Sequence, residues 1–427
     1  MKQFKVMMVA ALALVSVFSL SLSVQAQDNT PVVAAVQNDN VVITGAGSTV
    51  TVKNPANKGF QSLAWNPGAT KLAYIINDEQ YNAQIAVTDA NGSDPIVLNT
   101  GKLESGFPVS WTPDGQVLYV GAGDPSDTSK PYEVDLKRIA AEAGATPEVI
   151  GSFVMGVGCG GGSIFPGDWL YSEEAGFGGN ALILQYTDYG ILHSSTCSGG
   201  GLALYAPQGG QDTPLAGDNF LQPTPDQPQQ QVGRAVLGND GKTLAAVRTT
   251  YAEPAVKHEL VLIDLSTQEL KAVTTAAAPD QLAWSPGGSL FYSTQTKKGA
   301  LGEDLTGDQK ANVEKVFGSS ELDIPSNEVS IHALNLTSGD DKVIYTAQAY
   351  AIGRIVSTKD GQALIFSQIA NMDKWVEGIA NGTLDVVGDT FGTAQRAVVP
   401  VSLYRLPLAG GDATLISDGL GMFQLKP

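Results

Sequence analysis

Histidine and cysteine are scarce in this 427-residue chain, which has three histidines and two cysteines. His193, His258 and His332 lie far apart in the sequence, so a metal cluster of histidine and cysteine ligands has little to build on. The two cysteines do not form a C-x-x-C pair, which argues against a redox centre. The scarcity therefore excludes the commonest zinc and thiol chemistries from the expected functions.

Basic residues are also few, because 25 Lys and Arg face 43 Asp and Glu and the formal net charge is −18. A surface of this sign repels phosphate backbones and anionic lipids. Nucleic acid and membrane surfaces are therefore not expected partners. Solubility outside the cytoplasm explains the acidity more simply than a specific cationic partner does.

Long apolar runs are absent except at the start of the chain. Lys2 and Lys5 precede the apolar run Val6–Val24, and Val24-Gln25-Ala26 is a small-residue cleavage signal. Residues 1–26 are therefore predicted to be a signal peptide. No cysteine stands at that junction, so a lipid anchor is not expected, and no other run is long enough to span a membrane. The mature chain is expected in the periplasm or outside the cell.

The predicted export changes the interpretation of the two cysteines. In an oxidising compartment, Cys159 and Cys197 predict a single structural disulfide. Each stands beside a glycine-rich stretch, Gly156–Gly162 and Gly199–Gly201, so the bridge would join two flexible loops.

Sequence motifs of enzymes are missing as well. The chain has no G-x-S-x-G, no H-E-x-x-H and no P-loop. Gly156–Gly161 formally matches G-x-G-x-x-G, but Ser163–Phe165 and a Pro-Gly turn follow it instead of a helix. A nucleotide site is therefore not predicted there.

What the sequence does contain is a repeat, shown most completely by residues 63–100. Four short runs are rich in β-branched and aromatic residues, and turns of Gly, Pro, Asn and Asp separate them. The runs are Leu63–Trp65, Lys71–Ile76, Gln84–Asp89 and Pro95–Asn99. Four such strands predict one antiparallel meander, which has to stack on copies of itself to bury both faces.

Further copies of the first strand and its turn occur along the chain. Clear ones are LAWNPG at Leu63, VSWTPDG at Val109 and LAWSPGG at Leu282, and weaker ones begin near Ser163, Ala235 and Ile355. Trp65, Trp111 and Trp284 fall in the same register, which predicts that they pack between repeats.

The two ends of the chain predict one additional, composite unit. Val32–Val36, Asn40–Thr44 and Ser48–Lys53 look like second, third and fourth strands with no first strand before them. Met422–Pro427 aligns with Ser62–Pro67, so it supplies that missing first strand. Pairing the two ends would remove an open sheet edge and close a ring. We therefore favour seven repeats over the alternative of six.

This repeat resembles the TolB-like or WD-repeat-like β-propeller family, whose blades carry a W-S-P-D-G-like turn before a short apolar strand. The resemblance covers nearly all of residues 27–427 and implies an all-β fold, a single propeller of four-stranded antiparallel blades. No counterpart of the separate N-terminal domain of TolB is expected between the predicted cleavage site and the first full blade. The resemblance says little about function, because propellers include binding modules and enzymes alike.

Loop lengths single out one face of the expected propeller. The loop between the second and third strands is short in the first blade, Asn77–Ala83, but long in later blades at Glu173–Ser198, Gln295–Asn327 and Ile369–Ala397. Long loops gathered on one face favour a functional surface over tolerated drift.

One of these long loops resembles the calcium loops of dockerin and EF-hand type. Oxygen-bearing side chains recur at alternate positions, and the candidate ligands are Asp304, Thr306, Asp308, Asn312 and Glu314. The departures are Gln309 at the turn glycine and Lys315 at the last acidic position. Calcium is thus the one cofactor suggested, and a solvated acidic loop or a decayed site is the competing interpretation.

Two arginines share a register at the entrance of the innermost strands. Arg234 and Arg354 each stand three residues before the position of Trp65. They could bind a carboxylate or phosphate ligand at the channel mouth. Salt bridging between blades of a very acidic protein is the interpretation we favour.

Aromatic residues in the loops assigned to this face are candidate contacts for a partner. They are Tyr81, Tyr186, Tyr189, Tyr251 and Trp375. Folding back over the blades is an equally good interpretation of them.

Together these observations favour an exported, monomeric, non-enzymatic propeller that binds a protein or glycan partner through its long loops. The alternative is a hydrolase, lactonase or lyase whose site is assembled across blades at the central channel. Such a site takes single residues from distant blades, so the sequence does not identify catalytic residues.

Overall fold

The computed structural model describes residues 32–37, 40–45, 48–52, 60–77, 82–93, 95–104, 107–124, 132–155, 164–172, 179–186, 201–206, 211–214, 229–252, 255–302, 304–317, 324–370, 372–383, 387–388, 395–396, 401–418 and 420–426. The predicted signal peptide, the Gly156–Gly161 motif, and Cys159 and Cys197 lie outside these residues. Within the described ranges, no helix has the length and apolar character needed to cross a bilayer.

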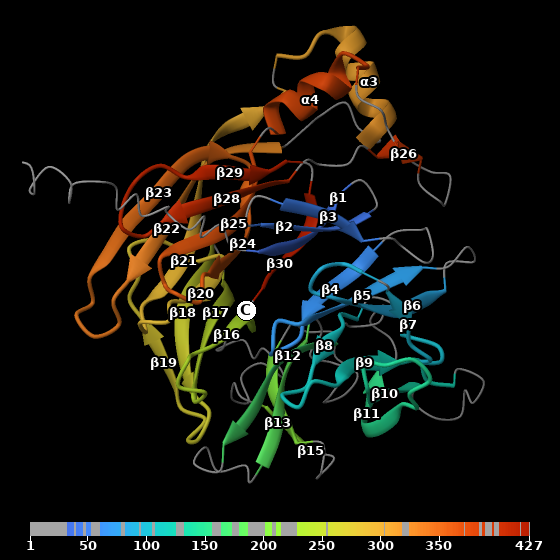
Figure 1. The fold of residues 1–427 in the computed structure, drawn as a ribbon. Coiled ribbons are helices and arrows are strands. Elements are labelled where there is room, and N and C mark those ends of the chain that lie inside the picture. The colour runs from blue at the N-terminus through green and yellow to red at the C-terminus, as the bar shows by residue number, and fades with distance from the viewer. Residues whose placement is uncertain are drawn as a thin grey trace, which may run out of the picture.

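The described residues form a β-propeller of four-stranded antiparallel blades (Figure 1). Six blades each take their strands from one continuous stretch of chain, and six is the number given above as the alternative. Blade 1 contains β4 (Phe60–Trp65), β5 (Lys71–Asn77), β6 (Ala83–Asp89) and β7 (Ile96–Val97). Blade 2 contains β8 (Ser110–Trp111), β9 (Val117–Gly121), β10 (Tyr132–Ile139) and β11 (Glu148–Met155). Blade 3 contains β12 (Ile164–Ser172), β13 (Gly179–Tyr186), β14 (Gly201–Ala206) and β15 (Gln211–Pro214).

The second half of the chain supplies the other three continuous blades. Blade 4 contains β16 (Gln229–Leu237), β17 (Thr243–Ala252), β18 (Ala255–Asp264) and β19 (Leu270–Val273). Blade 5 contains β20 (Leu282–Trp284), β21 (Leu290–Leu301), β22 (Ile324–Leu334) and β23 (Asp341–Ala349). Blade 6 contains β24 (Ala351–Ser357), β25 (Ala363–Ile369), β28 (Ser402–Pro407) and β29 (Thr414–Ser417). A small sheet of β26 (Val387–Gly388) and β27 (Gln395–Arg396) stands between β25 and β28.

A further four-stranded sheet, here called the composite sheet, joins the two ends of the chain. Its strands are β1 (Val33–Gln37), β2 (Asn40–Gly45), β3 (Ser48–Val52) and β30 (Leu420–Leu425). β30 pairs antiparallel with β1, with Val33 opposite Leu425 and Ala35 opposite Phe423. The predicted pairing of the C-terminal strand with the N-terminal strands is therefore confirmed.

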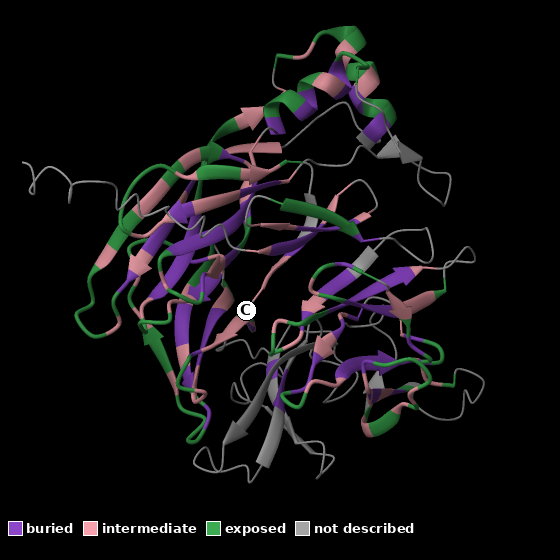
Figure 2. Cartoon of the chain, in the orientation of Figure 1, coloured by how far each residue is buried: buried purple, intermediate pink, exposed green. Residues whose placement is uncertain are grey.

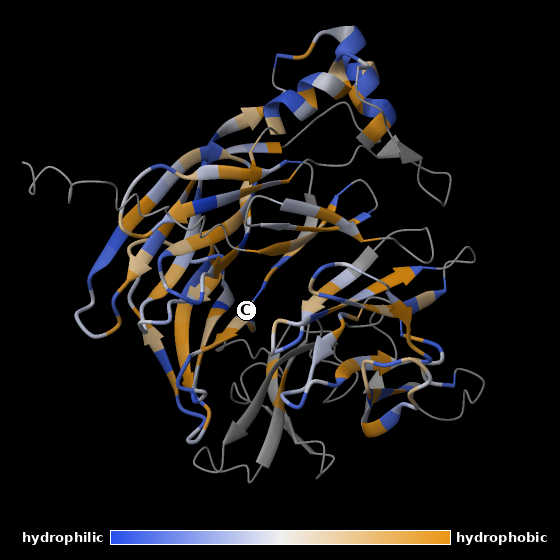
Figure 3. Cartoon of the chain, viewed as in Figure 1, coloured by the Kyte–Doolittle hydropathy of each residue, from blue (hydrophilic) through white to orange (hydrophobic). Residues whose placement is uncertain are grey.

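The composite sheet packs against a blade on each side. On one side, Ala34, Val41 and Ile43 share a buried cluster with Leu63 and Tyr74 of blade 1. On the other side, Val33, Ala35 and Val42 share a cluster with Ile365 and Leu403 of blade 6. Buried residues lie along the strands where neighbouring sheets face each other, and exposed residues gather in loops and on outer strands (Figure 2). The same strands are the apolar segments of the chain (Figure 3).

A tryptophan hydrogen bond recurs between adjacent innermost strands. The indole Nε1 of Trp65 donates to the carbonyl of Gln424, Trp111 to Ala64 and Trp284 to Val236, at 3.3, 2.8 and 2.9 Å. The three accepting residues hold the same register position in their strands. These bonds satisfy the polar end of each large apolar ring, so the predicted inter-blade packing of the tryptophans is confirmed.

The turn after the innermost strand has the sequence T-x-D-G in blades 2 and 6, at residues 112–115 and 358–361. In blade 2, the hydroxyl of Thr112 donates to Asp114 and the amide of Gly115 donates to the Thr112 carbonyl at 3.0 Å. Gly115 has a φ of +82°, which glycine adopts without strain. Thr358, Asp360 and Gly361 repeat this arrangement in blade 6.

Candidate functional site

Two helices stand on the face that carries the long loops, which we call the loop face. α3 (Gly307–Phe317) interrupts the connection between β21 and β22, and α4 (Met372–Ala380) follows β25. Both connections join the second and third strands of their blades, and the blades are neighbours. The helices stand together beyond the strands, at the top of Figure 1. We call them the helix pair.

The helix pair has an apolar core of its own. Val313 and Val316 of α3 pack with buried residues of α4, which are Met372, Trp375, Val376, Ile379 and Ala380. Leu301, Ile324, Tyr350 and Ile369 extend this cluster down to the strands of blades 5 and 6. Burying side chains of this size contributes about 1.5–3 kcal/mol each. Buried apolar contacts therefore fix the helix pair to both blades.

Polar contacts fix the orientation of the two helices. Asn312 Nδ2 donates to the Ala380 carbonyl at 2.8 Å, and Gln309 Nε2 donates to Asn381 Oδ1 at 2.9 Å. Gly382 follows the end of α4 with a φ of +65°, and its amide donates to the Ile379 carbonyl at 3.0 Å. The carbonyl groups at the end of α4 are thus satisfied partly by α3.

The predicted calcium loop does not have the geometry that prediction assumed. Only Asp304 and Thr306 precede the helix, whereas Asp308, Asn312 and Glu314 lie on α3. Gln309, at the expected turn glycine, accepts the Thr306 amide at 2.9 Å and so caps the helix. Asn312 is engaged with Ala380. Among the described residues, no group of three or more His, Cys, Asp or Glu is arranged to hold a metal ion.

The candidate aromatic residues differ in position and in exposure. Trp375 lies on α4 and is turned inward, 6% exposed in the core of the helix pair, which agrees with the second of the two interpretations given above. Tyr251 is 42% exposed near the end of β17, at the loop face. Tyr186 ends β13, and nothing is described of its side chain. Tyr81 and Tyr189 lie outside the described residues.

The two arginines each reach toward the next sheet. Arg234 of β16 pairs with the carboxylate of Asp280, and its Nη1 donates to the Asp280 carbonyl at 3.2 Å. Asp280 lies just before β20 of blade 5. Arg354 of β24 donates from Nη1 to the carbonyl of Phe423 at 3.2 Å, and its guanidinium lies 5.8 Å from the centre of the Phe423 ring. The Arg234 contact is an ion pair between blades 4 and 5, and the Arg354 contact joins blade 6 to the composite sheet through a carbonyl and an aromatic ring.

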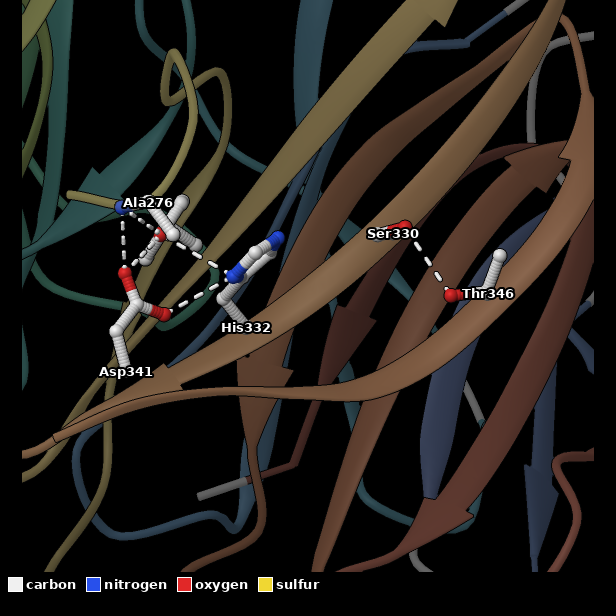
Figure 4. Close-up of polar contacts among 6 residues, drawn as sticks. Ala276, Ser330, His332, Asp341 and Thr346 are labelled. Atoms are coloured by element: carbon white, nitrogen blue, oxygen red, sulfur yellow. Dashed lines mark hydrogen bonds and ion pairs between the residues drawn. The ribbon is translucent and has the colours of Figure 1, made fainter.

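A polar cluster around the buried rings of Tyr292 and His332 in blade 5 has no counterpart among the predicted site residues (Figure 4). His332 Nδ1 lies 3.0 Å from Asp341 Oδ1 and 3.2 Å from the hydroxyl of Tyr292, which also donates to Asp341 Oδ2. The Ala276 amide donates to Asp341 Oδ2 at 2.8 Å. The Tyr292 and His332 rings stack with centres 4.6 Å apart.

Charge inside this cluster is concentrated on Asp341. Burial alone would raise the pKa of Asp341, but hydrogen bonds from Tyr292, the Ala276 amide and His332 hold it below its ordinary value. Burial, and then the neighbouring Asp341, raise the pKa of Tyr292 well above its ordinary value. Asp341 is thus an anion at neutral pH. Through the Ala276 amide it binds the connection between β19 of blade 4 and β20 of blade 5.

The Asp341→Asn variant is expected to be less stable than the wild type by about 1–3 kcal/mol at pH 7, because buried donors lose their charged acceptor. Asp341 has a depressed pKa in the folded state, so its contribution is present above the unfolded value of about 3.9 and is lost as pH falls through the folded value. Urea unfolding at pH 7 and pH 3 measures this difference. It should shrink at pH 3.

The control for this prediction is Asp340→Asn, because Asp340 is the exposed neighbour of Asp341. That variant should unfold within about 0.5 kcal/mol of the wild type. A D341N protein as stable as the wild type at pH 7, or a difference unchanged at pH 3, would contradict the role assigned to the Asp341 charge.

Comparison with known proteins gives a fold and no family. No family model matches the chain, and no curated protein sequence matches it. Solved structures that are similar include TolB from Acinetobacter baumannii, at 15% identity and a TM-score of 0.42, over 76% of this chain and 65% of that one. An oligogalacturonate lyase in complex with manganese is similar at 14% identity and a TM-score of 0.46, over 79% of this chain and 77% of the lyase. The β-propeller domain of the Trilobed protease from Pyrococcus furiosus is similar at 12% identity and a TM-score of 0.47, over 91% and 93%.

What these proteins share with the chain is the β-propeller fold. The chain spans slightly less than two thirds of the TolB chain. Structures described as a lyase and as prolyl endopeptidases occur among the similar ones beside TolB.

Proposed function

We propose that this protein is an exported, non-enzymatic binding or scaffold propeller that engages a protein or glycan partner through its loop face. The observation that carries the proposal is the helix pair. Two long insertions from neighbouring blades meet and share one apolar core. Insertions that merely drift in length have no reason to pack together.

The outer surface of the helix pair suits such a role. Residues of α3 and α4 that face away from the shared core are exposed, and they include Lys310, Glu314, Asp373 and Lys374. Their side chains lie on helices that buried contacts hold to blades 5 and 6. Binding a partner would therefore cost little conformational entropy in the backbone of this surface. A rigid, charged platform beyond the strands is a good surface for a specific partner.

A photo-cross-linking residue placed on the helix pair tests the proposal in the native host. Replacing Lys310 or Lys374 with a photoreactive amino acid should give adducts of discrete mass after irradiation. Mass spectrometry then identifies a protein adduct, and periodate sensitivity identifies a glycan. The expected result is the same adduct from both positions.

Control positions lie in exposed turns between third and fourth strands, on the opposite face of the propeller. Thr267 and Asp412 are suitable because both are exposed. Equal adducts from these controls would show indiscriminate contact. Absence of adducts from Lys310 and Lys374 would contradict the loop face as the binding surface.

We also infer that the composite sheet is a seventh blade of the propeller. It has the four-stranded order of the other blades, and it packs against blades 1 and 6 as they pack on their neighbours. The indole of Trp65 donates to Gln424 of β30 in the same register as Trp111 donates to Ala64 of β4. This assignment supports a closed ring with one elaborated face.

A further inference from the structure

Arg234 has a backbone conformation that is unusual for its place in the fold. Its φ is +53°, in the left-handed region that side chains other than glycine rarely adopt. Ala69 and Gln268, the other described non-glycine residues with positive φ, lie in turns between strands. Arg234 instead lies within β16, where the pairing with β17 shifts register between Gly233 and Val236. Strain of this kind and a β-bulge both tend to mark positions where a side chain is aimed at a function.

The guanidinium of Arg234 is held at one edge and open at the other. Its Nη1 contacts both the carbonyl and the carboxylate of Asp280, and the Asp280 amide is itself bound to the Ser293 carbonyl at 2.8 Å. Among the described residues, neither Nε nor Nη2 has a hydrogen bond or ion pair, and 54% of the side chain is exposed. Two parallel N–H donors on one edge match the two oxygens of a carboxylate.

Arg354 provides the contrast at the same register of blade 6. Its amide donates to Ser367 Oγ at 3.0 Å, and its guanidinium lies over the Phe423 ring while bonding to the Phe423 carbonyl. The Arg354 side chain is therefore engaged with β30, which closes the ring. Arg234 has no aromatic ring described against it, so its open edge needs another explanation.

The side of β17 and β18 that faces blade 5 adds polar and aromatic groups near Arg234. Val247 and Leu260 belong to the cluster shared with blade 5, so strand alternation places Thr249, Tyr251 and His258 on the same side. Thr249 Oγ1 lies 3.0 Å from Nδ1 of His258. Burial, and then the charge of Arg234, lower the pKa of His258, which is therefore neutral at pH 7.

We propose that the open edge of Arg234 binds the carboxylate group of a small, singly charged ligand at the seam between blades 4 and 5. The net charge of −18 repels polyanions, so one carboxylate rather than a polyacid suits this surface. Asp280 neutralises much of the guanidinium charge but keeps its donors in place. A dissociation constant on the order of 1–10 mM is expected for a simple carboxylate. This proposal is independent of the helix pair.

Histidine NMR signals can report binding, since the chain has only three histidines. The His258 signal, assigned with a His258→Gln variant, is followed while sodium benzoate or sodium acetate is added at constant ionic strength. Both carboxylates should shift the His258 signal and raise its pKa, because a bound anion offsets the charge of Arg234. Benzamide, the neutral analogue of benzoate, should leave the signal where it is.

Variants of Arg234 decide whether the guanidinium is responsible. Asn tolerates positive φ, so Arg234→Asn keeps the backbone conformation and should weaken benzoate binding at least tenfold. Arg234→Lys keeps the charge without the fork and should give an intermediate loss. Arg138→Gln removes an arginine paired with Glu148 in blade 2 and should bind like the wild type. An unchanged His332 signal shows that each variant is folded.

Three results would overturn the proposal. One is the absence of any His258 shift up to 100 mM carboxylate. Another is unchanged binding by Arg234→Asn. The third is an equal response to benzamide, which would assign the shift to the aromatic ring. None of them bears on the helix pair, whose cross-linking test is separate.

Discussion

A chain that lacks residues 420–426 is expected to melt about 6–12 °C below the full-length protein. Removing β30 exposes the edge of β1 and strips Phe423 from the cluster that joins the composite sheet to blade 6. Phe→Ala changes in cores alone cost about 3–5 kcal/mol. With the strand hydrogen bonds, the total is about 5–10 kcal/mol. An unfolding entropy of about 2.1 cal/mol/K per residue converts that loss into the stated shift.

The loss should extend to both neighbours of β30. The Trp65 indole and the Arg354 guanidinium both donate to backbone carbonyls of β30, and they would lose these acceptors together. Differential scanning calorimetry measures the shift. A synthetic peptide of residues 420–426, added in excess, should restore part of it by mass action. A truncated chain that melts like the full-length protein would rule out β30 as the strand that closes the ring.

The Trp375→Ala variant is expected to release the helix pair while leaving the blades folded. Trp375 is 6% exposed at the centre of the cluster between α3 and α4, and truncating a buried tryptophan costs about 3–5 kcal/mol. That is comparable to what a few buried side chains contribute to holding two short helices on a sheet. Hydrogen exchange should therefore speed up in residues 307–317 and 372–380 but stay slow in β21 and β25.

Lys374→Ala is the matched control for the tryptophan variant, because Lys374 is the exposed neighbour of Trp375 on the same helix. Its exchange pattern should equal that of the wild type. If α3 and α4 remained protected in Trp375→Ala, the shared core would not be what holds the two insertions together. The same variant should also lose the cross-linked adducts expected from Lys310.

The blades were predictable because their signals are local. The strand predicted at Lys71–Ile76 is observed at Lys71–Asn77, and the strand predicted at Gln84–Asp89 is observed at Ala83–Asp89. Runs of β-branched and aromatic residues between turn residues mark both of them. The C-terminal strand was predictable for a different reason. Its sequence repeats the register of Ser62–Trp65, and an unpaired first strand is costly at a sheet edge.

The helix pair was missed, although the sequence contains its signals. Thr306 and Gln309 have the spacing of a capping box, and the Gln309 side chain accepts the Thr306 amide. The buried positions 372, 375, 376, 379 and 380 follow the helical period. The spacing of oxygen-bearing side chains resembles that of a calcium loop, but Gln309 caps α3 and Asn312 binds the end of α4. An amphipathic stretch read with a period of 3.6 would also have placed Trp375 inside.

The Tyr292–His332–Asp341 cluster could not be predicted from spacing. Its members come from three strands, and the amide of Ala276 comes from a crossover. Only the register of β21, β22 and β23 brings them together. The direction of the Arg234 side chain could not be predicted from the sequence either, because it depends on a β-bulge and on the φ angle of Arg234.

The pairing of β30 with β1 also sets an order of events during synthesis. β1, β2 and β3 are made early, but their sheet lacks its innermost strand until residues near the C-terminus have emerged. The edge of β1 therefore stays unpaired while nearly all of the remaining chain is synthesised. Sheet edges left open in this way invite pairing with other chains. Assembly of this protein should therefore be slowest, and most dependent on chaperones, at its last step.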